Sequence, residues 1–184
     1  MRFLTILLIL FVPGQLVRAQ SFLDQTHQYQ QAVDQRLDQY TLTQAQAFQY
    51  STDGADVLYY RDGQNLVKIE IRMLGESGKL FRSFYMKNQA VLLVSDRAFQ
   101  YNVPYYLDSV KATELGLSEF FDPNETKEIQ ARFYFLDNQL AQITGAESHT
   151  QRFSIMQWGE TLMAMYQELQ ILEDRQWLFK AASV

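Results

Sequence analysis

The chain has 184 residues, of which 47% are hydrophobic and 14% aromatic, and its 16 basic and 21 acidic side chains give a formal net charge of −5. That length suits one domain with its own core, and without any cysteine the core has no disulfide to support it. No cluster of lysine or arginine stands out, which argues against nucleic acid and anionic membrane surfaces as partners, because both attract clustered positive charge.

Residues 1–19 have the pattern of a cleavable secretory signal. Arg2 is followed by an apolar run over residues 3–12, and Val17 and Ala19 supply the small residues expected before a cleavage point. A membrane anchor is the alternative, but a span needs about 20 apolar residues and this run is roughly half as long. We therefore expect cleavage after Ala19 and export to the periplasm or cell surface. An exported chain without cysteine points to a bacterial source.

The expected mature chain, residues 20–184, should form one domain without a transmembrane segment. Losing Arg2 and Arg18 leaves 14 basic against 21 acidic residues, a net charge near −7. Its first part, residues 21–50, is rich in Gln and free of Gly and Pro, which predicts a helical region. A helix over residues 22–40 would be followed by a second short one ending near Phe48. Its apolar positions recur at helical spacing, with Thr26 filling one gap, at Phe22, Tyr29, Val33, Leu37 and Tyr40.

Residues 56–101 predict a β-meander. The strands expected are residues 57–61, 66–73, 80–87 and 90–95, separated by turns rich in Gly, Asp and Asn. Within the second of them Ile69 and Ile71 alternate with Lys68, Glu70 and Arg72, so we expect the charged side chains to form a solvated face paired across strands. The apolar run over residues 91–94 indicates a central strand.

An insertion at residues 102–126 interrupts the meander. It contains two prolines and two aromatic pairs, and a loop of this length in a small domain is usually functional. A helical turn is expected within residues 113–121. A β-hairpin then follows over residues 128–144.

A short repeat links three of the expected hairpins. An aromatic strand end precedes a tight polar turn and an aliphatic strand at Tyr59-Tyr60, at Phe84-Tyr85 and at Phe133-Tyr134. With Gly78-Lys79-Leu80 and Asn88, the pattern resembles the hairpin repeats of MORN-like and YwqK-type proteins over about a quarter of the chain. Gln89 occupies the position where those repeats usually have Gly. The resemblance implies hairpins and no particular activity.

Residues 152–174 predict a C-terminal helix. An apolar stripe runs from Ile155 to Leu172 at helical spacing, and Gly159 on that stripe suggests close approach to the sheet. The whole pattern predicts an α+β fold, in which an antiparallel meander of about six strands packs against an N-terminal and a C-terminal helix as a two-layer sandwich.

No residue set points to catalysis, to a metal or to a cofactor. The two histidines, His27 and His149, lack any paired ligand spacing, and no nucleophile–base motif or phosphate-binding Gly pattern occurs. We therefore do not expect an enzyme.

The leading hypothesis is a non-enzymatic periplasmic or surface binding module. Tyrosine suits interfaces, because its ring is large and its hydroxyl tolerates water. The expected contact residues lie around the insertion at Tyr101, Tyr105, Tyr106 and Phe121. One alternative is a carrier of a lipid or other apolar ligand, with Leu92, Met163 and Met165 lining a cavity, and a hydrolase is a third, weaker alternative.

Overall fold

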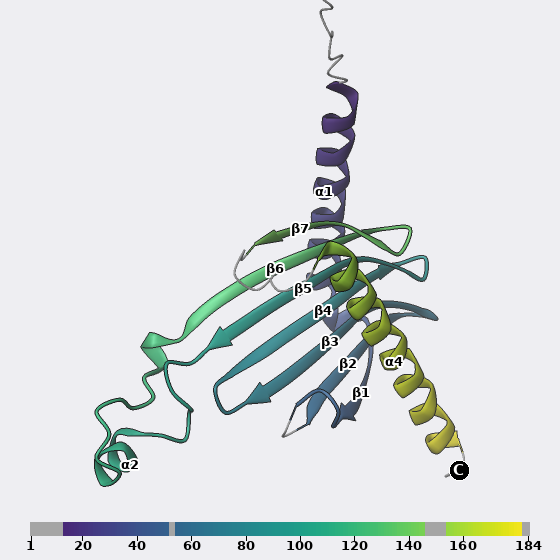
Figure 1. The fold of residues 1–184 in the computed structure, drawn as a ribbon. Coiled ribbons are helices and arrows are strands. Elements are labelled where there is room, and N and C mark those ends of the chain that lie inside the picture. The colour runs from purple at the N-terminus through teal and green to yellow at the C-terminus, as the bar shows by residue number, and fades with distance from the viewer. Residues whose placement is uncertain (1–12, 52–53, 146–153, 182–184) are drawn as a thin grey trace, which may run out of the picture.

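The computed structural model describes residues 13–51, 54–145 and 154–181, with side chains described over 20–51, 54–145 and 154–175. Seven antiparallel strands form one sheet in chain order, and α1 and α4 pack on its two faces (Figure 1). The helical elements are α1 (Pro13–Asp34), η1 (Leu37–Gln39), α2 (Ser109–Glu114), η2 (Pro123–Glu125) and α4 (Ile155–Ala181). The strands are β1 (Thr41–Ala47), β2 (Ala55–Asp62), β3 (Asn65–Gly75), β4 (Gly78–Lys87), β5 (Ala90–Gln100), β6 (Lys127–Leu136) and β7 (Gln139–Gly145).

The predicted α+β meander with a helix at each end is confirmed, with seven strands in place of about six. The difference is β1, because the predicted helical region 21–50 is wrong beyond η1. Ala45 and Ala47 are buried against the core while the alternate residues Gln44 and Gln46 are exposed, which is the period of a strand. Pairing with β2 overrides the helical preference of Gln and Ala, since tertiary context outweighs intrinsic propensity.

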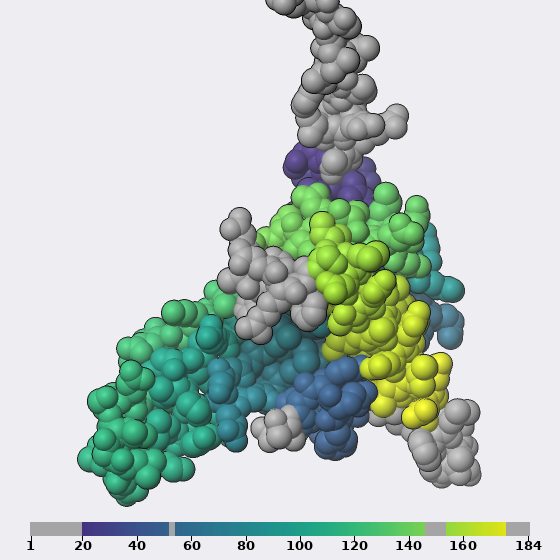
Figure 2. All heavy atoms as spheres, in the orientation of Figure 1, coloured from purple at the N-terminus to yellow at the C-terminus, as the bar shows by residue number. Residues whose placement is uncertain are grey.

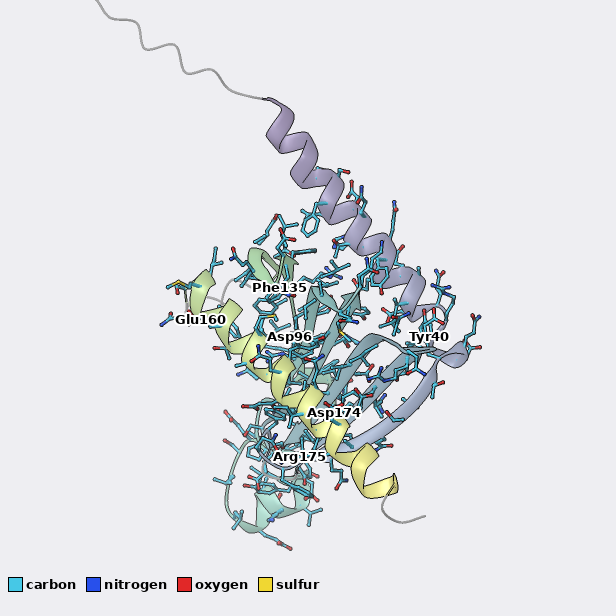
Figure 3. All side chains as sticks on the ribbon, turned by 90° about the vertical axis from the view of Figure 1, so that its right-hand side faces the viewer. Tyr40, Asp96, Phe135, Glu160, Asp174 and Arg175 are labelled. Atoms are coloured by element: carbon cyan, nitrogen blue, oxygen red, sulfur yellow. The ribbon has the colours of Figure 1, made fainter. Side chains whose placement is uncertain are left out.

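The helices cover opposite faces of the sheet, so the expected two-layer sandwich is wrong and the domain has three layers. Figure 3 shows the sheet between the two helices, with Glu160 and Asp174 on α4 and Tyr40 beyond the end of α1. Both faces of the sheet are apolar enough to bury a helix, because the two rings of each aromatic pair lie on opposite faces of the sheet. Residues 1–12 of the expected signal lie outside the described residues, and residues 13–19 are the first turns of α1.

The α4 face carries the larger core. Its fully buried rings, Tyr59, Phe84, Phe133 and Phe135, lie within one cluster that includes Leu162 and Leu169 of α4. The Tyr59 hydroxyl donates to the Leu169 carbonyl at 2.9 Å. Gly159 allows the close approach expected of it, because a Cβ there would lie 3.0 Å from the Leu140 Cβ.

The α1 face carries a smaller cluster. Val33 of α1 is buried on the sheet, and Phe22, Leu23 and Tyr29 pack at its edge. The sheet residues beneath are Leu58, Tyr60, Val67, Tyr85, Leu93 and Tyr134. The N-terminal part of α1 extends beyond the sheet (Figure 1).

Three hairpins repeat one geometry. The β2–β3, β4–β5 and β6–β7 pairs each have a register shift directly after the second aromatic residue, at Tyr60, Tyr85 and Tyr134. Asn88 and Gln89 form one two-residue turn with φ of 52° and 65°, and Asp137 and Asn138 form another with φ of 51° and 60°. Asn and Asp tolerate this left-handed backbone well, which suits them to such hairpin turns, and Gln89 adopts it as well.

Candidate functional site

The predicted insertion is an ordered arm, defined here as residues 102–126. It contains α2 and η2 and projects from the end of β5 and β6 as a separate lobe (Figures 1 and 2). The helical turn expected within residues 113–121 lies earlier, at Ser109–Glu114, because Asp108 is a good N-cap and its side chain accepts a hydrogen bond from the Lys111 N–H at 2.9 Å.

Backbone and amide hydrogen bonds hold the arm together. The Phe121 N–H donates to the Leu107 carbonyl at 2.7 Å, and the Asn102 side chain donates to the Phe120 carbonyl at 2.9 Å. At the base, Tyr101 and Tyr105 donate their N–H groups to the carbonyls of Ser77 and Glu76 in the β3–β4 turn. The Phe121–Leu107 bond and the two bonds at the base join backbone groups only, so substitutions of the arm's exposed rings should leave its backbone in place.

The four predicted contact residues form two ring pairs. Tyr101 and Phe121 meet edge to face with centroids 5.0 Å apart, and both are half-buried, so this pair supports the base of the arm. Tyr105 and Tyr106 meet at 6.0 Å and keep 52% and 45% of their surface exposed. The exposed pair is therefore available to a partner, with the Lys111 ammonium 4.9 Å from the Tyr106 ring centroid.

Further apolar side chains of the arm are exposed that the sequence reading missed. They are Val110, Leu115, Leu117 and Phe120, each at least 45% exposed. The arm also contains five acidic residues and one lysine. Periodicity could not identify this surface, because the single short helix α2 has too few turns to show an apolar face.

A cluster of charged side chains around Lys68 lies under α1, where the sequence predicted a solvated face. Lys68 is only 4% exposed, so that expectation is wrong at this position: α1 covers it. Its ammonium lies 2.9 Å from Asp34 Oδ1 and 3.4 Å from Glu70 Oε2. The Tyr85 hydroxyl donates to Asp34 Oδ2 at 2.9 Å. Burial alone would lower the pKa of Lys68, but Tyr85, Asp34 and Glu70 together outweigh burial and raise it.

The α4 face holds a different ionic group. Arg82 and Asp96 are each 8% exposed and pair through two hydrogen bonds of 2.7 and 2.6 Å, with the Met165 sulfur 3.3 Å from the guanidinium. Since both charges are compensated and lie beneath a helix, we assign this pair a structural role.

The described residues, which include His27, contain no cluster of three or more His, Asp or Glu side chains that could hold a metal ion. His27 Nε2 lies 2.5 Å from the Tyr134 hydroxyl, which ties α1 to β6. His149 lies outside the described residues.

Of the residues expected to line a carrier's cavity, Met165 is buried in the core and Met163 borders a cleft of about 650 Å³. Leu140, Ile155, Met156 and Gly159 share that cleft with Met163. Among the described helices, none combines the length and the hydrophobicity needed to cross a bilayer. Comparisons with protein families, characterised proteins and solved structures find no match for this chain.

Proposed function

We propose that this chain is an exported, non-enzymatic interaction module whose arm binds a partner protein. The observation that supports this role is the exposure of Tyr105 and Tyr106 on an arm held by backbone hydrogen bonds. A surface that is already ordered loses little conformational entropy on binding, so its apolar side chains contribute more of their burial to affinity. Large apolar residues grouped on one small lobe are typical of contact surfaces.

The charge of the arm indicates the chemistry of its partner. Five acidic side chains lie within 25 residues that carry a single lysine. An apolar groove rimmed by lysine or arginine on a partner protein would complement both features. An anionic membrane surface would be repelled by the same acids, which makes a protein the better-matched partner.

Site-specific photo-crosslinking tests the proposal. A photoreactive phenylalanine analogue at position 106 should give one crosslinked protein in cells of the source organism, while the same analogue at Phe48, which is 72% exposed and does not belong to the arm, should not. The purified partner should then bind the wild-type protein more weakly as salt increases, because the complementary charges are screened.

The double variant Tyr105→Ala/Tyr106→Ala should weaken that binding by about 100-fold, since buried tyrosines at interfaces commonly contribute about 2 kcal/mol or more. Its melting temperature should equal that of the wild type, because both rings are exposed. Phe48→Ala is the matched control and should leave affinity unchanged. Equal crosslinking at positions 106 and 48, or unchanged affinity in the double variant, would contradict the arm as the binding surface.

A carrier of an apolar ligand is the second candidate, favoured by the cleft beside Met163. Its volume is about 650 Å³ and its lining includes Leu140, Ile155 and Met156, which suits a single acyl chain. Native mass spectrometry of protein purified from its own source should then show a bound lipid. A clean apo mass would argue against this candidate.

A further inference from the structure

A polar cavity of about 410 Å³ lies between the C-terminal half of α1 and strands β3, β4 and β5. Its floor is formed by Ser83 and Ser95, which are direct cross-strand partners. Their neighbours along the strands on this face are large, so two small side chains side by side leave a notch. The lining residues are Gln30, Asp34, Lys68, Glu70, Arg72, Phe81, Ser83, Tyr85, Ser95 and Arg97.

One wall of the cavity is a row of two guanidinium groups with an aromatic ring between them. Phe81 pairs in register with Arg72 on one side and with Arg97 on the other. With strands about 4.8 Å apart, the two arginine backbones are roughly 10 Å from each other. A small ligand lying over the Phe81 ring can therefore reach both guanidinium groups.

Both arginines keep donors available. Arg72 Nε donates to Glu70 at 2.7 Å and Arg97 Nε donates to Glu128 at 3.0 Å. Among the described residues, no hydrogen bond involves the terminal nitrogens of either side chain. Free guanidinium forks favour a carboxylate, which they can bind through two parallel hydrogen bonds.

The opposite wall offers groups that recognise hydroxyls. The Asp34 side chain is 37% exposed, and it is held in place by Lys68 and Tyr85. Gln30 lies beside it and its amide is 3.4 Å from the Tyr85 hydroxyl. Planar carboxylate and amide groups with serine hydroxyls can donate to and accept from the hydroxyls of one sugar ring.

We propose that this cavity binds a small carboxylated sugar of the uronate class. The three cations of the lining are balanced by Asp34, Glu70 and the adjacent Glu128, so the terminal guanidinium nitrogens, and not a net charge, would hold the carboxylate. The carboxylate would meet Arg72 and Arg97, the ring would lie on Phe81, and the hydroxyls would face Asp34 and the serines. The site belongs to the α1 face and does not depend on the arm's proposed role.

Titration of isotope-labelled protein with D-glucuronate, followed by NMR, tests the proposal. We expect saturable binding, with shifts centred on the Ser83 and Ser95 amides. Glucose, which lacks the carboxylate, and acetate, which lacks the hydroxyls, should each bind at least tenfold more weakly. Equal affinity for either of these probes, or no saturable binding of glucuronate, would overturn the proposal.

Two kinds of variant locate the ligand. Arg97→Gln removes an exposed charge and should weaken glucuronate binding about tenfold or more, as expected for a charge-assisted hydrogen bond. Ser95→Leu fills the notch without changing charge and should abolish binding. Lys127→Gln, a cation on the opposite face of the sheet, is the charge control and should have no effect, as should Tyr105→Ala/Tyr106→Ala. Unchanged binding in both Arg97→Gln and Ser95→Leu would also overturn the proposal.

Discussion

The two faces of the sheet are built from the same strands yet differ in chemistry. The α4 face buries a continuous apolar cluster, into which the Arg82–Asp96 pair is fitted. The α1 face has a smaller cluster and, beside the C-terminal half of α1, a cavity lined by charged and small polar side chains. The cavity beside α1 is therefore polar, whereas the cleft beside α4 is lined by apolar side chains such as Leu140, Ile155 and Met156.

This difference in chemistry arises because the two rings of each repeated aromatic pair lie on opposite faces of the sheet. The first ring of each pair joins the apolar cluster under α4, whereas the second is a tyrosine of the α1-face cluster that lies close to a charged or polar side chain. Tyr85 donates to Asp34, Tyr134 meets His27, and Tyr60 lies 5.7 Å from the Lys68 ammonium. We infer that the α4 face provides most of the stability, which leaves the α1 face free to vary for binding.

The largest expected effect comes from breaking the buried pair on the α4 face. Asp96→Ala leaves the Arg82 charge buried without its partner and should lower the free energy of unfolding by about 3–5 kcal/mol, measured by urea denaturation. The double variant Arg82→Met/Asp96→Leu should recover most of the loss, since an apolar pair suits its surroundings.

The exposed Arg97–Glu128 pair on the α1 face is the control for this experiment. Its side chains are 53% and 38% exposed, so Glu128→Ala should leave the urea midpoint unchanged. A loss of stability as large as that of Asp96→Ala would remove the distinction between the faces.

Truncating one leucine on each helix compares the stability that the two faces provide, with smaller expected losses than Asp96→Ala. Leu162→Ala empties a fully buried position of α4 and should destabilise by about 3 kcal/mol. Leu23→Ala on α1 removes a partly buried side chain at the edge of its cluster and should cost about 1 kcal/mol. Equal losses in urea denaturation would show that both helices stabilise the fold alike.

Alkaline pH should weaken both faces through different groups. Burial raises the pKa of Tyr59 above its ordinary 10.0 on the α4 face, and the pairing described above raises that of Lys68 above 10.5 on the α1 face. A pKa raised by folding stabilises the protein fully below the unfolded value, and that contribution is lost as pH increases beyond it. The unfolding free energy should therefore fall above about pH 10, by up to about 1.4 kcal/mol per pH unit for each group.

Tyr59→Phe and Lys68→Met should each make this decline shallower, as measured by urea denaturation between pH 9 and 11. An unchanged slope in Lys68→Met would mean that Lys68 takes no part in the alkaline loss.

The elements predicted correctly from sequence were those with local patterns. Alternation around Ile69 identified β3, the helical stripes identified the faces of α1 and α4, and turn residues such as Asn88 placed the hairpins. These signals arise within a few residues of one another, so one chain is enough to show them.

What sequence could not show depends on contacts distant along the chain. Lys68 was expected in solvent because nothing near it in sequence reveals that α1, 34 residues earlier, would cover it. The cavity above Ser83 and Ser95 needs the β4–β5 register, and β1 needs β2 beside it. The aromatic pair at 105–106 was identified by composition alone, and its exposure rests on the arm's backbone bonds.

The smallest predicted effect concerns neither face. Gln89 has a φ of 65° in the β4–β5 turn, a left-handed conformation that costs a residue with a Cβ about 1 kcal/mol. Gly adopts it without that cost but loses more entropy on folding, so Gln89→Gly should stabilise by about 0.5 kcal/mol. Because Gln89 is exposed and belongs to neither apolar cluster, this gain should add equally to Leu162→Ala and Leu23→Ala in urea denaturation. A gain that differs between the Leu162→Ala and Leu23→Ala backgrounds would mean that the turn is energetically coupled to one face of the sheet. The two faces could then not be treated as independent of the β4–β5 hairpin.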